Sequence, residues 1–597
     1  MNNLAKSDIF SASLLYIIKV IVISLILFNF NKVFAEETSV DAEPFEIWGE
    51  STNQFIPQLE NSDLEEEVIE GEVLDSNSND SLEGIVRSDF NYSIDDTIGL
   101  YDESNGGFSS NIWKSSNFKD IYYLIMNLPK EISNNELLDL KLISLLTIAT
   151  PPKDPTPSDP NFLQVKIDHF KSVGDYNSIL SISELIDEEQ WDQNLVQNIM
   201  NFHLLKNNYK NVCNNNIFNQ ISSEKESLKI KAFCNAMSNN LPAIDLIISL
   251  IIEEETYDND LVYILNSYLN EMDIDISKIQ NLDLYKLNLI NNKGIDFSRN
   301  ISGESEIELQ LFYINSEIDS SIKKITLTEN LLSRGIVESG ALANVYEKYL
   351  LDNKIEVDFN PNDSVSDLEK RVMLYNQIRQ TSNQLDLLPL ASEYVVNMGN
   401  ANLLINSASL IYDKIKIIVP KQEYKDHALS VCLLLLLNDD LEQCQNWIVN
   451  LDFIKDAEEI KTRIKFYLSL RENNKNLSEE DINWLLNDSE IPVNHKNVLA
   501  KYSELRYELE LMEYWKSENE LDKVSTQVSN IKLTQYLKSI PLENKGEIIL
   551  LISLIHGNNL TNMIDQHSLF LILESLNRLD PVYLDNFVFE YFVNNQI

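Results

Sequence analysis

The sequence predicts an all-α protein, a solenoid of stacked helical hairpins that follows an acidic leader. Glycine and proline number only 14 and 15 among 597 residues, too few for a large all-β protein with many tight turns. From about residue 111 onward, apolar residues recur at helical spacing, as Leu228, Ala232 and Ala236 do. Turn markers recur at intervals of 32 to 39 residues, which predicts that one short helical unit repeats along the chain.

The net charge excludes one broad class of partner. Asp and Glu number 94 against 47 Lys and Arg, so the formal charge is −47. A chain this acidic cannot hold a phosphate backbone by releasing counterions, which excludes nucleic acid. Its electrostatic field favours basic partners and repels anionic lipid.

Residues 1–35 are typical of a secretory signal peptide. Lys6 and Lys19 supply positive charge before an apolar run at 20–28, and Val33-Phe34-Ala35 places small residues where a signal peptidase cleaves. The alternative is an uncleaved membrane anchor, but the run is shorter than the roughly 20 residues that span a bilayer. The sequence therefore predicts export to the periplasm, with the cell exterior or cell surface as alternatives.

An acidic leader over 36–110 follows. Residues 36–103 contain 21 acidic residues and one basic residue, Arg87. Such a segment cannot offset the entropy of an ordered chain, so we expect it to be disordered. Phe45, Ile47 and Trp48 form an aromatic island within it, a possible docking motif that folds on a partner. The alternative is an apolar patch with no partner, or one that lies on the protein's own folded part.

The helical region is divided by turns and started by caps. Asn, Asp and Gly tolerate the left-handed backbone conformation that tight corners require. Capping boxes, in which a hydroxyl and a carboxylate satisfy the first backbone amides, are predicted at Ser223/Glu226, Ser366/Glu369 and Ser478/Asp481. The predicted corners are Gly174-Asp175, Asn207-Asn208, Asn239-Asn240, Met272-Asp273, Gly399-Asn400, Asn438-Asp439 and Asn473-Asn474.

These markers predict seven segments. In order they are a signal peptide at 1–35, a disordered leader at 36–110, N-terminal capping helices at 111–150, a proline-rich connector at 151–160, a first helical array at 161–355, a break at 356–366 and a second array with a C-terminal cap at 367–597. The aromatic residues of the last segment, from Tyr583 to Phe592, have helical spacing and predict the packing face of a final helix.

The segment from Phe170 to Ile179, FKSVGDYNSI, resembles the helix–corner–helix junction of tetratricopeptide repeats. The match is degenerate, because Ile179 stands where that family prefers alanine and no downstream proline recurs at the proper place. Residues 112–129, 137–152 and 170–176 also make the chain similar to a group of uncharacterised exported proteins of alphaproteobacteria. The first resemblance implies a right-handed α-solenoid and the second implies export.

The four cysteines form two local pairs. Cys213 and Cys234 are centred close to Ser222–Ser223, and Cys432 and Cys444 are equidistant from Asn438. Residues equidistant from the corner of a helical hairpin lie at the same height, so each pair satisfies the short Cα–Cα distance of a disulfide. Export would supply the oxidising compartment. Buried free thiols and metal ligation remain the alternatives.

The sequence contains no motif that assigns catalytic, cofactor-binding or metal-binding residues, and we predict no cofactor. Its six histidines form no tight ligand spacing, and the phosphate-binding loop and the nucleophile elbow are both missing from the sequence. The leading prediction is a non-enzymatic scaffold or assembly factor that binds protein partners in the bacterial envelope, and that meets a membrane only if the signal peptide remains as an anchor. The alternatives are an all-α carbohydrate-active or other hydrolase with carboxylates on several helices, and a structural protein without a specific partner.

Overall fold

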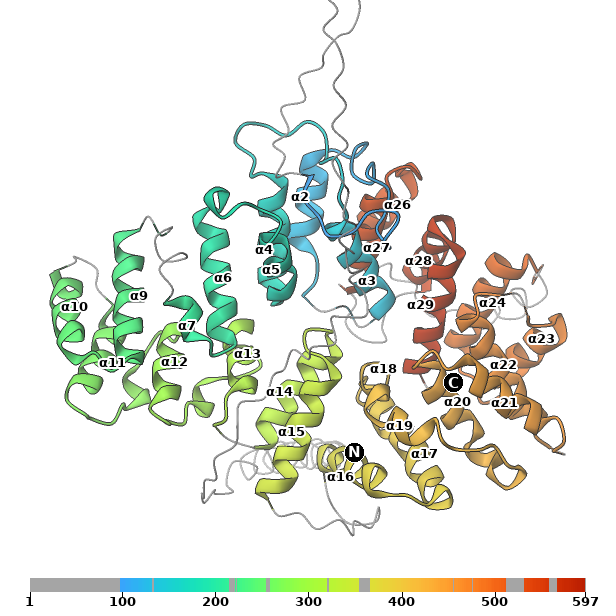
Figure 1. The fold of residues 1–597 in the computed structure, drawn as a ribbon. Coiled ribbons are helices and arrows are strands. Elements are labelled where there is room, and N and C mark those ends of the chain that lie inside the picture. The colour runs from blue at the N-terminus through green and yellow to red at the C-terminus, as the bar shows by residue number, and fades with distance from the viewer. Residues whose placement is uncertain are drawn as a thin grey trace, which may run out of the picture. The chain divides into compact units, whose positions relative to one another are not determined.

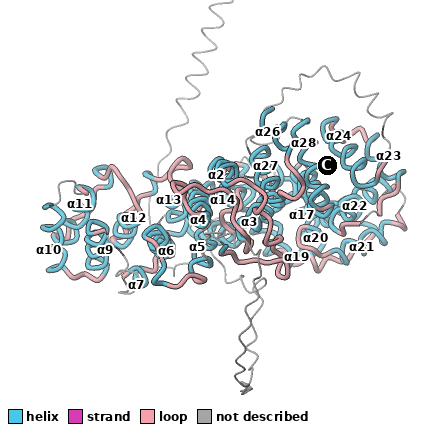
Figure 2. Tube along the Cα trace, turned by 90° about the horizontal axis from the view of Figure 1, so that it is seen from above, coloured by secondary structure: helices cyan, strands magenta, loops and turns pink. Residues whose placement is uncertain are grey.

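A computed structural model describes residues 97–595, apart from 131, 133, 214–220, 222, 254–257, 319–320, 354–365, 455, 475, 510, 512–530 and 558–565. The described part is all-helical, and its β-structure is limited to two isolated bridges, Tyr101 with Thr147 and Asn117 with Lys153 (Figure 2). Across these residues, every helix is too short or too polar to cross a bilayer. The predicted signal peptide and nearly all of the predicted break at 356–366 lie outside the described residues.

The first half of the chain forms helices that pack mostly on their neighbours in sequence (Figure 1). They are α2 (Phe118–Asn127), α3 (Asn135–Leu146), α4 (Phe162–Val173), α5 (Tyr176–Ser183), α6 (Gln193–Leu205), α7 (Tyr209–Val212), α9 (Glu224–Met237), α10 (Leu241–Glu253), α11 (Asn259–Leu269), α12 (Leu284–Asn292), α13 (Ile307–Asn315), α14 (Ile322–Ser333) and α15 (Ser339–Asp352).

The second half continues in the same way. Its helices are α16 (Asp367–Gln380), α17 (Gln384–Asn400), α18 (Leu404–Ser407), α19 (Tyr412–Ile415), α20 (Ala428–Leu436), α21 (Leu441–Leu451), α22 (Glu458–Arg471), α23 (Glu479–Asn487), α24 (Val493–Tyr507), α26 (Ile531–Ser539), α27 (Lys545–Gly557), α28 (Gln566–Leu579) and α29 (Pro581–Asn594). Successive helices pack together in the pairs α16–α17, α20–α21, α21–α22 and α28–α29.

The predicted corners are left-handed at five of the seven positions. Gly174, Asn207, Asn239, Asp439 and Asn473 all have positive φ. The other two corners are displaced by one or more residues, since the left-handed residue is Glu271 before the predicted Met272-Asp273 and Asn402 after the predicted Gly399-Asn400. The turn chemistry of Asn, Asp and Gly thus locates corners well, although packing selects the residue that adopts the strained conformation.

Two of the three predicted capping boxes are complete. Ser366 with Glu369 and Ser478 with Asp481 each exchange both hydrogen bonds. Ser223 accepts a hydrogen bond from the backbone N–H of Glu226 at 3.3 Å, but the returning bond from the Glu226 carboxylate is missing. The Glu226 side chain is therefore turned away from its cap.

The predicted leader at 36–110 extends too far, because residues 97–110 already pack on the helical core. Leu100 donates its backbone N–H to Leu146, and the Nζ of the buried Lys166 donates to the carbonyl of Ile98 at 2.9 Å. A Cβ at Gly99 would lie 2.5 Å from the Leu146 carbonyl oxygen, so only glycine allows this close approach. Apolar side chains such as Leu100 and Phe108 pack against the core and outweigh the low average hydropathy of the segment.

The first described helices pack against the last ones. Helix α2 contacts α27, and α3 contacts both α27 and α29 (Figure 1). Trp113 is fully buried and its ring covers Gly546 at the start of α27. Ser116 donates a hydrogen bond to Glu547 at 2.9 Å across a sequence separation of 431 residues. The two ends of the helical part of the chain therefore form one core.

Helix α29 is the most widely shared packing element of this core. It contacts α3, α17, α18, α22, α24 and α28. Phe587, Phe589 and Phe592 are buried on it, while Tyr583 and Tyr591 are partly buried. The prediction that the aromatic C-terminal segment is a packing face is confirmed.

A glycine-to-alanine change within a helix usually stabilises a protein. The contact between Trp113 and Gly546 predicts the opposite effect at Gly546. A Cβ at Gly546 would lie 2.3 Å from the Trp113 ring, so Gly546→Ala should lower the free energy of unfolding by about 1–3 kcal/mol through overpacking. Gly340 in α15 has open space around its Cα, so Gly340→Ala should raise it by up to about 1 kcal/mol. Urea unfolding followed by circular dichroism measures both, and equal stabilisation by the two variants would contradict the close contact.

Candidate functional site

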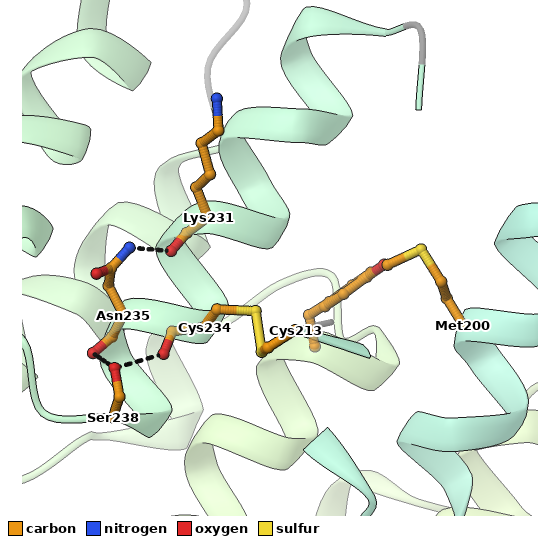
Figure 3. Close-up of a disulfide and its surroundings, with 7 residues drawn as sticks. Met200, Cys213, Lys231, Cys234, Asn235 and Ser238 are labelled. Carbon is orange, nitrogen blue, oxygen red and sulfur yellow. Dashed lines mark hydrogen bonds between the residues drawn. A yellow bond between two sulfur atoms is a disulfide. The ribbon is translucent and has the colours of Figure 1, made fainter. Parts of the chain in front are cut away.

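The first predicted disulfide is present. Cys213 at the end of α7 and Cys234 in α9 are bonded, with Cα atoms 5.7 Å apart. Figure 3 shows the bond between the two helices, with Asn235 and Ser238 further along α9 and Met200 of α6 nearby. The bond joins the end of α7 to α9, and α7 packs on both α6 and α9. Closing a loop of this length stabilises a fold by about 3 kcal/mol in the chain-entropy model.

The second predicted disulfide is not formed. Cys432 in α20 and Cys444 in α21 are both fully buried free cysteines, and a hydrogen bond joins their thiols. The predicted proximity is therefore correct, but the bond is not. Burial raises the pKa of the Cys432 thiol, and the hydrogen bond to Cys444 raises it further, so the thiolate that disulfide exchange requires is disfavoured. The predicted docking motif Phe45, Ile47 and Trp48 lies outside the described residues and stays a prediction.

A pocket lies between the first turns of α6 and α9, and the Cys213–Cys234 disulfide lies further along α9. Its volume is about 370 Å³, within the range of small-ligand sites. Gln193, Asn194, Val196 and Gln197 line it from α6, and Ile221, Ser223 and Glu226 line it from the start of α9 and the residues before it. Three amides, a hydroxyl and one carboxylate thus converge with two aliphatic side chains.

Two amides of the pocket, Asn194 and Gln197, donate hydrogen bonds to neighbouring side chains. Asn194 donates through Nδ2 to the Asp168 carboxylate at 3.0 Å, which fixes the orientation of its amide because a carboxylate only accepts. Gln197 donates through Nε2 to Asn201 at 3.1 Å and to the Tyr285 hydroxyl at 3.5 Å. Among the described residues, nothing donates to the Gln197 carbonyl oxygen, which remains a free acceptor.

Glu226 contributes a carboxylate in the first turn of α9. Its carboxylate is missing from the capping box that Ser223 begins, and in the described part of the chain it forms no ion pair. The nearest cations behind the pocket are held by other acids. Lys229 pairs with Asp283 at 3.1 Å and lies over the Tyr285 ring, and the buried Lys286 pairs with Asp258 at 2.8 Å. The pocket is therefore both rich in acceptors and negative.

A second group of titratable side chains lies where α3 meets α29. Burial and the nearby Asp139 raise the pKa of Glu136 to about 7, against the lowering effects of a hydrogen bond from Asn586 and of Arg471. Burial raises the pKa of Glu590 to about 8, although its carboxylate accepts the Asn135 N–H at 2.6 Å. Burial also raises the pKa of Asp139, to about 6, and this side chain keeps contact with solvent. These carboxyls do not form a metal centre, since the described residues contain no suitable group of ligands.

Sequence reasoning missed both groups. In the sequence, Ser223 and Glu226 indicate only a helix cap. Only the structure shows that the Glu226 carboxylate does not take part in that cap. Glu136 and Glu590 are 454 positions apart in a chain with 94 acidic residues, so no spacing could single them out.

The cysteines give a direct test by thiol mapping. Denatured, unreduced protein should contain two alkylatable thiols, at Cys432 and Cys444, while Cys213 and Cys234 remain linked. Mass spectrometry of the peptides identifies both states. Four alkylated thiols would contradict the first disulfide, and a Cys432–Cys444 crosslink would contradict the free buried pair.

The carboxyls between α3 and α29 predict a loss of stability as pH rises. Raised pKa values mean that the folded state binds more protons than the unfolded chain, whose Glu pKa is about 4.3. Their stabilising effect is complete below that value and is lost as pH rises through about 7 to 8. Glu590→Gln should therefore be more stable than the wild type at pH 8.5, by about 1–3 kcal/mol, and nearly equal to it at pH 5.

The matched control is Glu442→Gln on the exposed face of α21, which changes the net charge equally. Urea unfolding at pH 5, 7 and 8.5 measures the free energies. A pH dependence that is the same in Glu590→Gln as in Glu442→Gln would show that Glu590 is not buried against α3.

Comparison with known proteins assigns no family. No protein-family model, no curated protein sequence and no solved structure matches this chain. Any function proposed for the chain therefore rests on its own sequence and structure.

Proposed function

We propose that this chain is an exported, non-enzymatic helical-repeat protein that binds protein partners in the bacterial cell envelope, as a scaffold or assembly factor. Its helical hairpins would stack into a right-handed α-solenoid of the tetratricopeptide-like kind. The recurrent left-handed corners and the packing of successive helices support the hairpin unit. The Cys213–Cys234 disulfide supports an oxidising compartment, as export would provide.

The observation that carries the binding function is the pocket between α6 and α9. It presents hydrogen-bond acceptors and a carboxylate that has no ion pair in the described part of the chain. Glu226 is partly buried and has no ion pair among the described residues, and such a carboxylate costs free energy unless a ligand pairs with it. The net charge of −47 favours partners that carry basic segments.

A second candidate function, hydrolysis by paired carboxylates, is favoured by Glu136 and Glu590. Their pKa values of about 7 and 8 suit a general acid near neutral pH. Both side chains, however, lie in the packing contact of α3 with α29, and Glu590 is bonded to the backbone of Asn135. The pocket itself contains a single carboxylate, so binding is the function that the described residues support better.

Site-specific crosslinking in the native envelope tests the proposed function. A photo-crosslinking residue at the exposed Gln193, on the pocket rim, should capture a partner in stoichiometric amount. The same residue at the exposed Glu442 on α21 is the control and should not capture that partner. Repeated failure to recover a position-dependent partner from Gln193 would overturn the scaffold function, and turnover of an envelope polysaccharide that Glu590→Gln abolishes would favour the hydrolase.

A further inference from the structure

We propose that the pocket between α6 and α9 binds the guanidinium group of an arginine side chain in the partner, with Glu226 as its counter-ion. This inference rests on the proposed binding function and names the chemical group that the site recognises. It follows from the hydrogen-bonding capacity, the charge and the shape of the pocket.

The hydrogen-bonding capacity of the pocket selects a donor. The NH₂ groups of Asn194 and Gln197 are directed away from the cavity, toward Asp168 and toward Asn201 and Tyr285. The Gln197 carbonyl oxygen is open to a ligand, whereas that of Asn194 already accepts a hydrogen bond from Asn198 at 3.4 Å and keeps one lone pair. The Glu226 carboxylate adds two more acceptors. A ligand rich in acceptors, such as a carboxylate or a phosphate, would meet repulsion there.

The charge of the pocket selects a cation. A folded protein normally gives a partly buried carboxylate an ion pair or a capping role, and Glu226 has neither among the described residues. The exposed Glu224 of the same helical turn does not line the cavity. Lys229 is engaged by Asp283 and the Tyr285 ring, so it does not neutralise Glu226 in place of a ligand. A charge-assisted hydrogen bond to Glu226 would be about twice as strong as a neutral one.

The shape of the site favours guanidinium over ammonium. Ile221, which is partly exposed, supplies aliphatic surface for the methylene stem of a long side chain. The acceptors come from different helices, namely α6 and the first turn of α9, so they approach a ligand from different sides. A planar group with five N–H donors satisfies several such acceptors at once, whereas an ammonium has three donors on one atom.

Binding of a short peptide to the full chain tests this assignment. The probe is fluorescein-labelled Gly-Arg-Gly amide, and its anisotropy reports binding to the intact protein. Replacement of Arg by citrulline, which is nearly isosteric but neutral, should weaken binding about tenfold to hundredfold, since hydrogen bonds to charged groups contribute about 1.5–3 kcal/mol. Replacement of Arg by Lys should weaken it by a smaller factor.

The paired variants Glu226→Gln and Glu224→Gln locate the effect. Both remove one charge from the first turn of α9, so they alter net charge and helix-end electrostatics equally. Glu226→Gln should reduce the affinity for the arginine peptide about tenfold or more and abolish the preference over citrulline, while Glu224→Gln should change it less than about twofold. Far-UV circular dichroism of both variants checks that they are folded.

The outcomes separate this assignment from the proposed function. Equal affinity for the arginine and citrulline peptides in the wild type, or equal loss in the two variants, would overturn the arginine site. Partner capture from Gln193 that persists in Glu226→Gln would then still support envelope binding. Loss of both peptide binding and partner capture in Glu226→Gln, with both retained in Glu224→Gln, would support the arginine site within the proposed function.

Discussion

The fold depends on the burial of α29 among helices from both halves of the chain. This one helix contacts α3 near the first described helices, α17 and α18 in the middle, and α22, α24 and α28 near the end. Its aromatic residues bury large apolar surfaces, and Asp585 in the same helix binds Arg506 and Tyr502 inside the core. Removal of α29 would expose the apolar faces of several helices at once, so the second half of the chain and α3 are not separable modules.

Electrostatics and packing oppose one another at this helix. Glu590 lies on α29 near Glu136 and Asp139 of α3, and the burial of Glu590 and Glu136 becomes less favourable as they lose their protons. The apolar residues of the same contact, such as Phe587 and Leu137, provide the driving force that holds these carboxyls together. The interface therefore combines a strong apolar term, which does not depend on pH, with a weaker term that does.

The sequence predicts the local features of the fold well. The helical class, the left-handed corners at Gly174, Asn207 and Asn239, and the cap of α16 follow from chemistry that acts over a few residues, and each is found in the structure. The Cys213–Cys234 bond belongs to the same group, because a helical hairpin fixes which positions face each other. The free Cys432 and Cys444 pair shows the limit of such reasoning, since geometry predicts the contact but burial decides its chemistry.

Contacts between distant segments could not be predicted in this way. The packing of α2 and α3 on α27 and α29 is set by the shapes of complete surfaces, and no periodicity in the sequence records it. The pocket is similarly hidden, since Gln197 and Glu226 are ordinary polar residues until the orientation of an amide and the failure of a capping box are visible. Packing also overrode composition at residues 97–110, where a few apolar side chains hold an otherwise polar segment on the core.

The contact of Trp113 with Gly546 has a consequence for the order of assembly. The ribosome adds Trp113 more than four hundred residues before Gly546, the glycine that the Trp113 ring covers. It likewise adds Ser116 long before Glu547, the hydrogen-bond partner of Ser116. During synthesis, the residues of α2 and α3 are made long before α27 and α29, so their apolar faces have no final partner until the C-terminal helices emerge. Exposed apolar surface of this kind favours aggregation in a nascent chain, so this core can be completed only after the last helices are made.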